Sequence, residues 1–338
     1  TKNQAEAVTL TIEDGSAYHQ TTLYSGNSST QTITQSGFNS TFQPDLIWGK
    51  QRTGAQEPTI FDAVRGTTKY IQTNSTAGEA TQSGVTAFNS NGFNLGSWAV
   101  MNQSSNTHVA WQWLAGNSTS SNSDGSITST VSVNQTAGFS IVTYTGTGSA
   151  ATVGHGLGST PSWILVKKLN ASVFWAVYHA ANTSAPETEY LKLNTTDATA
   201  DDAGYWNDTA PTSSVFSINN ESAVNTEDGT YVAYCWCEKP GFSKFGSYEG
   251  NDNDNGPYIP LNFSPAFVMV KNIDAAGGWP MYDNARTPFN PSDKNLNADQ
   301  NGAEYSPDYT FDLLSNGFKI RDAQAYVNDA NTYIYMAF

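Results

Sequence analysis

A seven-residue segment that occurs three times is the strongest constraint on how this chain can fold. Each copy has a proline, one further residue and an apolar run that ends in lysine: PDLIWGK at 44–50, PSWILVK at 161–167 and PAFVMVK at 265–271. Proline is tolerated at the first position of a strand, where it gives up only a terminal hydrogen-bond donor. Because the apolar residues do not alternate with polar ones, we expect a strand that is buried on both faces.

The residues that follow this segment recur at the same spacing. An aromatic residue stands 17 positions after each proline and is followed by Asp62, His179 and Asp283 in the three copies. Three positions further on are Arg65, Asn182 and Arg286. A closing strand reads THVAWQW from 107, TYVAYCW from 230 and TYIYMAF from 332. Repeats of this kind indicate three copies of one structural unit.

The copies span residues 15–116, 137–238 and 239–338, and residues 1–14 form a separate N-terminal segment. The polar stretch 117–136 is predicted to be a linker or a long loop. A unit of about 100 residues with short strands and turns rich in Gly, Asn and Pro is typical of an antiparallel β-sandwich. The predicted fold is therefore all-β, with three tandem sandwiches of jelly-roll or lectin-like type. Since a unit of this size can build its own core, we expect independent beads.

The charge of the chain limits its partners. With 15 basic and 30 acidic residues the formal net charge is −15, which repels nucleic-acid phosphates and anionic lipid. Its apolar runs are strand-sized, well short of the roughly 18 to 20 residues that span a bilayer. We therefore expect neither nucleic acid nor membrane insertion. The two cysteines, Cys235 and Cys237, lie on one face of one strand and are interpreted as buried thiols.

The recurring charged residues suggest little chemistry. The second copy lacks the Asp and Arg of the other two, so we interpret that pair as structural. We also interpret the recurring lysines as structural, because their aliphatic stems can pack at strand ends; they are Lys50, Lys167 and Lys271. No nucleophile, zinc-protease or phosphate-loop motif is present in the sequence. We therefore expect no catalytic residues and a protein that is not an enzyme.

Two segments are candidate binding sites. Tyr205, Trp206, Asn207 and Asp208 form the best candidate for glycan binding, because aromatic rings stack on sugar rings while polar groups bond the hydroxyls. The loop NDNDNG at 251–256 resembles the start of a calcium loop, with Asp252 and Asp254 as ligands, although Asn262 stands where a helical-loop site has glutamate. We expect no cofactor, and calcium is the one ion whose binding this acidic loop does not exclude.

Four stretches carry a family resemblance: FSKFGSYEGN at 242–251, PAFVMVKNIDAAGGWPMYDNAR at 265–286, FDLLSNGFKI at 311–320 and TYIYMAF at 332–338. They resemble a repeat of virion structural proteins from tailed phages of marine and aquatic bacteria, including cyanophages. That repeat often accompanies concanavalin-like lectin domains in proteins called tail fibre. The resemblance covers most of 15–338. The second copy departs from it at His179 and Asn182 and lacks the NGF turn.

The resemblance implies a non-enzymatic virion protein, made in the bacterial cytoplasm and exposed on the particle. It would be a tail-fibre or receptor-binding appendage that mediates host adsorption by binding glycan. The implied partners are other copies of the chain, with a trimer as one option, other virion proteins and a host cell-surface glycan. The alternatives are a capsid-decorating or head-fibre protein and, second, a glycan-degrading enzyme, whose paired carboxylates need no fixed sequence motif.

Overall fold

The computed structural model describes residues 12–306 and 310–338. It confirms the all-β prediction, with 41% of residues in strands and 3% in helices. The described helical segments are short: the α-helix α1 (Ala99–Asn102) and the 3-10 helices η1 (Gly15–Ala17) and η2 (Pro186–Thr188). Within the described residues, no helix has both the length and the apolar character needed to cross a membrane.

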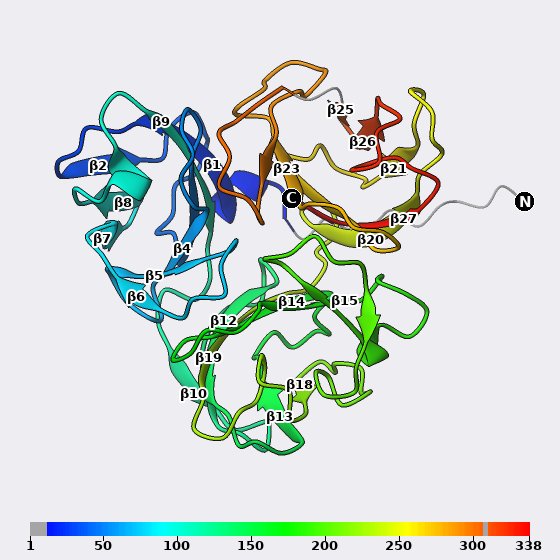
Figure 1. Cartoon of the computed structure of the whole chain (residues 1–338). Helices are drawn as coiled ribbons and strands as arrows, with labels where there is room; N and C mark the ends of the chain where they lie inside the picture. Colours follow the sequence, from blue (N-terminus) through cyan, green and yellow to red (C-terminus); the bar gives the residue numbers. More distant parts are fainter. Residues whose placement is uncertain (1–11, 307–309) are drawn as a thin grey trace, which may run out of the picture.

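The strands form three lobes, each with one large and one small antiparallel sheet (Figure 1). The first lobe, blue to cyan in Figure 1, pairs a six-stranded sheet in the order β1-β9-β3-β4-β5-β6 with a three-stranded sheet in the order β2-β8-β7. Its strands are β1 (His19–Ser25), β2 (Gln31–Thr34), β3 (Leu46–Gln51), β4 (Thr59–Asp62), β5 (Lys69–Gln72), β6 (Ala80–Thr81), β7 (Val85–Asn89), β8 (Gly92–Leu95) and β9 (Thr107–Trp113).

The second lobe, green in Figure 1, has an eight-stranded sheet in the order β10-β11-β12-β19-β14-β15-β16-β17 and a small sheet of β13 and β18. Its strands are β10 (Ser120–Asn122), β11 (Ser129–Asn134), β12 (Phe139–Thr145), β13 (Ala151–Gly154), β14 (Trp163–Lys168), β15 (Ala176–His179), β16 (Glu189–Lys192), β17 (Ala200–Asp201), β18 (Val215–Ile218) and β19 (Thr230–Trp236).

The third lobe, yellow to red, has a five-stranded sheet in the order β20-β27-β22-β23-β24 and a three-stranded sheet in the order β21-β26-β25. Its strands are β20 (Lys244–Glu249), β21 (Tyr258–Pro260), β22 (Phe267–Asn272), β23 (Pro280–Asp283), β24 (Leu296–Asn297), β25 (Phe311–Leu314), β26 (Gly317–Ile320) and β27 (Thr332–Ala337). In every large sheet the closing strand (β9, β19 or β27) lies between the strand of the proline segment (β3, β14 or β22) and a further strand, β1, β12 or β20, which we call the opening strand. This strand order occurs three times, while the predicted residue boundaries of the units stay predictions.

The prediction of a linker or long loop at 117–136 is wrong, because β10 and β11 lie in this segment and extend the second large sheet. The segment Ser129–Asn134 reads STVSVN, in which valine alternates with polar residues. Val131 is 2% exposed and pairs with Val142 of β12. A short alternating stretch can therefore add a strand even inside a polar, serine-rich segment, since alternate side chains reach the core.

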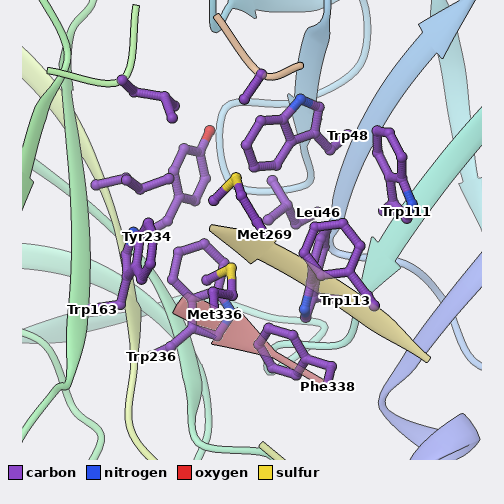
Figure 2. Packing of buried hydrophobic residues seen from close by; sticks show 14 of the residues in the cluster. Leu46, Trp48, Trp111, Trp113, Trp163, Tyr234, Trp236, Met269, Met336 and Phe338 are labelled. Atoms are coloured by element: carbon purple, nitrogen blue, oxygen red, sulfur yellow. The ribbon is translucent and has the colours of Figure 1, made fainter. Parts of the chain in front are cut away.

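The prediction of three independent beads is also wrong, because the lobes share one core. A single cluster of buried apolar side chains takes residues from all three large sheets, including Trp113, Trp236 and Phe338 at the ends of the closing segments. Figure 2 shows these rings together with Trp111, Tyr234 and Met336. Each large sheet has buried apolar side chains on both faces: one face packs on the small sheet of its own lobe, and the other meets the neighbouring lobes. A lobe alone would expose the second face to water.

Candidate functional site

The predicted glycan-binding residues do not form an open platform. Tyr205 and Trp206 are 4% and 2% exposed and belong to the core of the second lobe. The Tyr205 ring stacks on Tyr190 at a centroid distance of 3.7 Å, and Trp206 packs edge-on against Tyr178 at 5.8 Å. Asn207 and Asp208 are exposed in the turn that follows. The sugar-stacking role of the two rings is therefore contradicted, because neither ring has a face free for a ligand.

The predicted calcium ligands lie on the surface. Asp252 and Asp254 are exposed in the loop between β20 and β21. Across residues 12–306 and 310–338, no three His, Cys, Asp or Glu side chains gather closely enough to hold a metal ion. The loop is held by amides, since Asn328 Nδ2 donates to Asn251 Oδ1 and to the Asn253 carbonyl. Calcium at this loop stays a prediction.

The recurring Asp and Arg residues form buried ion pairs inside their lobes. In the first lobe, Arg65 Nε donates to Asp62 Oδ2, and the backbone N–H of Arg65 donates to Asp62 Oδ1 at 2.8 Å. In the third lobe, Arg286 and Asp283 make the same contacts. Both aspartates also accept a hydrogen bond from another lobe, from Tyr234 Oη to Asp62 at 2.7 Å and from Trp111 Nε1 to Asp283 at 3.0 Å.

The second lobe uses a neutral imidazole at the corresponding place. His179 is 1% exposed, and burial lowers its pKa to about 4. Its Nδ1 accepts from the Ala181 N–H at 3.0 Å, so Nε2 carries the hydrogen and donates to the Tyr335 carbonyl of the third lobe at 3.1 Å. The third lobe presents Met336 where the others present Trp111 and Tyr234. Methionine cannot donate a hydrogen bond to a carboxylate, and the neighbouring Tyr335 carbonyl accepts one. A neutral histidine, which donates, therefore suits the contact with the third lobe better than an aspartate would.

The three recurring lysines join the lobes in a ring. Lys50 Nζ of the first lobe donates to the Asn301 carbonyl of the third at 3.1 Å. Lys167 Nζ of the second lobe donates to Thr76 O of the first at 2.7 Å, and Lys271 Nζ of the third donates to Thr196 O of the second at 3.0 Å. Burial lowers the lysine pKa values to about 8, 7 and 8, respectively. Their ammonium groups are occupied with contacts between lobes.

Backbone hydrogen bonds follow the same ring. Each runs to the carbonyl two residues after a recurring lysine, at 2.7, 2.7 and 2.9 Å. The donors and acceptors are Glu304 N to Arg52 O, Glu79 N to Leu169 O and Thr199 N to Ile273 O. We call the three boundaries between lobes seams. At the seam between the first and third lobes an additional ion pair joins Arg52 to Glu304 at 2.8 Å.

A cavity of about 230 Å³ lies at this same seam, near the C-terminus marked in Figure 1. The first lobe contributes η1, the start of β1 and Phe38, and the third lobe contributes Phe242, Phe263 and Phe338. Phe38 is 40% exposed, and Ser264 and Asn284 are exposed beside it, so these residues lie at the opening. The cavity combines aromatic surface with uncharged polar groups, as ligand sites commonly do.

The β1 wall of the cavity has unpaired polar atoms. His19, Gln20 and Thr21 are 4%, 1% and 6% exposed. Among the described residues, His19 Nε2, Gln20 Oε1 and Thr21 Oγ1 have no hydrogen-bond partner. The His19 ring stacks on Phe338 at 5.3 Å, and burial lowers its pKa to about 3, so it is neutral at physiological pH. A buried polar atom without a partner is destabilising, and three consecutive residues carry one here.

Comparison with known proteins adds a family. Residues 14–338 match the family described as Domain of unknown function (DUF7483). The chain belongs to the DUF7483 family. No curated protein and no solved structure matches it.

The cavity of this DUF7483 chain includes residues that the sequence did not single out. The opening strand β1 contains His19, Gln20 and Thr21. The corresponding residues of β12 in the second lobe are simply buried in its sheet. The sequence contains one indication of this difference. The residues HQTT at 19–22 of β1 are polar, whereas the residues at the same register of β12, FSIV at 139–142, are mostly apolar. The contribution of the third lobe, more than 200 positions away, has no local sign.

Proposed function

We propose that this chain is a non-enzymatic structural protein of a tailed-phage virion that serves as a tail-fibre or receptor-binding appendage. The proposal rests on the resemblance of the repeated segments to phage virion proteins. The structural observation that carries it is the single core shared by the three lobes. An exposed appendage must resist shear, and a lobe of this body cannot separate without exposing the apolar faces of its two neighbours.

The buried ionisable groups support a structural role. Asp62 and Asp283 each hold an arginine and a donor from another lobe, and the recurring lysines hold carbonyls across the seams. A general acid, base or nucleophile must reach the reacting atoms of its substrate. These groups are instead engaged in hydrogen bonds between lobes.

Localisation on the particle tests the proposal. Purified virions in which mass spectrometry detects the chain would be labelled with gold-conjugated antibodies against it. We expect gold at the tail. Labelling spread over the icosahedral faces would favour a capsid-decorating or head-fibre protein, and absence of the chain from purified virions would overturn the proposal.

Adsorption and hydrolysis assays test the role. Purified chain added before infection is expected to compete with virions for the host surface and slow adsorption. Incubation with host surface polysaccharide is expected to release no new reducing ends. Release of reducing ends that a single carboxylate substitution abolishes would overturn the non-enzymatic assignment and favour a glycan-degrading enzyme.

A further inference from the structure

We infer that the cavity between the first and third lobes binds one neutral sugar ring. The inference deepens the proposed function, on which it rests for its biological meaning, by giving adhesion a site and a ligand class. The cavity stands apart from the predicted cluster at 205–208, whose rings are buried in the second lobe. It is built by the first and third lobes, so it exists only where these two lobes pack together.

The size of the cavity sets the size of the ligand. A volume of about 230 Å³ is smaller than the roughly 300 Å³ at which pockets for drug-sized ligands begin. The space therefore suits a single ring rather than a chain of several. Three phenylalanines of the third lobe and Phe38 of the first lobe border the space, and their rings offer apolar surface to the C–H face of a pyranose.

The charge of the cavity sets the charge of the ligand. None of the described side chains that line it is charged at neutral pH, because the lining groups are serine, threonine, glutamine, asparagine, neutral histidine and apolar residues. A carboxylate or ammonium group would lose its hydration there without gaining an opposite charge. Sialic and uronic acids are accordingly disfavoured, and the acidic chain as a whole repels them further.

The unpaired atoms on the β1 wall favour a ligand with many hydroxyls. Gln20 Oε1 requires a donor, whereas Thr21 Oγ1 can donate or accept. The two side chains lie on opposite faces of β1, and the Gln20 amide is held in place because its Nε2 donates to Ser16 O and Ser40 O. Thr21 Oγ1 is therefore the atom that a ligand hydroxyl would reach, after rotation of the threonine side chain or through one bridging water. A purely apolar ligand would leave the Thr21 hydroxyl unpaired, whereas a sugar ring carries several groups that both donate and accept. Ser264 and Asn284 add polar groups at the opening.

The experiment uses the purified full chain and a panel of free sugars. Saturation-transfer difference NMR would be recorded with neutral hexoses, N-acetylated hexoses, sialic acid and glucuronic acid. We expect saturation transfer to at least one neutral sugar and none to the acids. A trisaccharide with the same terminal sugar distinguishes a site for the end of a glycan from a site for a free monosaccharide. A site for glycan ends keeps its affinity for the trisaccharide, whereas a site for free monosaccharide excludes the longer chain.

Three variants place the binding at the cavity. Phe38→Ala is expected to weaken binding about fivefold, and Ser264→Trp to abolish it by filling the opening. Thr21→Val removes a hydroxyl that lacks a partner in the free protein, so it is expected to leave stability unchanged or raised while weakening sugar binding several-fold. Thr21→Ser is expected to restore binding. Phe289→Ala is the matched control, since Phe289 is 81% exposed and lies outside the cavity.

Several results would overturn the inference. These are no saturation transfer to any neutral sugar, stronger binding of the acids, or neutral-sugar binding that Phe38→Ala and Ser264→Trp leave unchanged. Thermal unfolding of each variant verifies that it is folded, which is expected because Phe38 and Ser264 are exposed. Since the assay uses isolated protein, its failure is independent of the localisation result on virions.

Discussion

The Tyr234 hydroxyl donates a 2.7 Å hydrogen bond to Asp62 Oδ2, although the two residues lie in different lobes and 172 positions apart. Trp111 and Asp283 make the equivalent contact across the same sequence separation, in this case from the first lobe to the third. At the remaining seam, Met336 takes the donor's position and His179 takes that of the aspartate. Contacts of this kind close the three lobes into a ring.

Asp62→Ala is expected to destabilise the protein much more than Tyr234→Phe. Loss of the carboxylate leaves the buried Arg65 guanidinium without its main partner, at a cost of about 3 to 5 kcal/mol. Loss of the hydroxyl removes one hydrogen bond, at about 1 kcal/mol. The free energy of unfolding in urea measures both, with the exposed Tyr258→Phe as a control of little effect. Equal costs for the two variants would contradict the importance of the ion pair.

His179→Asp and Asn182→Arg together are expected to rebuild in the second lobe the ion pair of the other two. His179→Asp alone buries a carboxylate without a cation, so it is expected to cost more than about 2 kcal/mol. Adding Asn182→Arg should recover a large part of that loss. A double-mutant cycle measures the coupling, expected at about 1 to 3 kcal/mol. A coupling near zero would show that the second lobe cannot accommodate the pair.

Lys167 is expected to make stability rise with pH. Burial lowers its pKa from 10.5 to about 7, so between these values the unfolded chain binds more protons than the folded one. Stability therefore increases as pH rises through this window, and it is lower below pH 7. Relative to Lys167→Met, the wild-type chain should gain about 2 kcal/mol between pH 7 and pH 9.

Urea unfolding at the two pH values measures this gain. The matched control is Lys69→Met, because the Lys69 side chain is 48% exposed. That variant measures how the loss of an exposed lysine, which pairs with Glu79 at 3.5 Å, changes stability at the same two pH values. A pH-independent difference for Lys167→Met would mean that the lysine stays charged in the folded seam.

Trp206→Ala is expected to act on stability. The ring is 2% exposed and packs on Tyr178, so its removal leaves a cavity and costs about 3 to 5 kcal/mol. Asp208→Asn, in the exposed turn beside it, should stay within about 0.5 kcal/mol of the wild type. Glycan-array binding lost in a Trp206→Ala variant of unchanged stability would instead restore the sugar-stacking prediction.

Cys235 and Cys237 are expected to be unreactive in the folded protein. Their residues are 0% and 1% exposed, and burial raises the pKa of both thiols. A thiol-specific reagent such as DTNB should therefore modify neither thiol under native conditions and both in urea. Ser118→Cys, at an exposed position, supplies a thiol that should react at once. Rapid reaction of the native wild-type chain would contradict the burial.

The strands could be predicted because their information is local. The proline segments became β3, β14 and β22, and the closing segments became β9, β19 and β27. In the first closing strand alternate side chains point to opposite faces: Val109, Trp111 and Trp113 face the shared core, while Ala110 packs toward the small sheet. A period of two and a run of apolar residues are properties of neighbouring residues, so they can be recognised without knowing the fold.

The candidate sites could not be predicted in the same way. Tyr205 and Trp206 stand among polar residues in the sequence, but their burial depends on Tyr178, Tyr190 and the small sheet of the second lobe. The cavity depends on β1 and Phe38 meeting Phe242, Phe263 and Phe338 from the other end of the chain. Local polarity is therefore a poor guide to exposure where distant segments supply the cover.

The sequence by itself determined the strands, the threefold repeat of the proline segment and the closing strand, and the second apolar face of each large sheet. Only the tertiary structure decided what covers that face. Independent sandwiches and a shared core use the same strands, and they differ in contacts between residues as far apart as Tyr234 and Asp62. Burial and pairing are set by what lies nearby in space, so the seams, the neutral His179 and the cavity emerge only when the three lobes pack together.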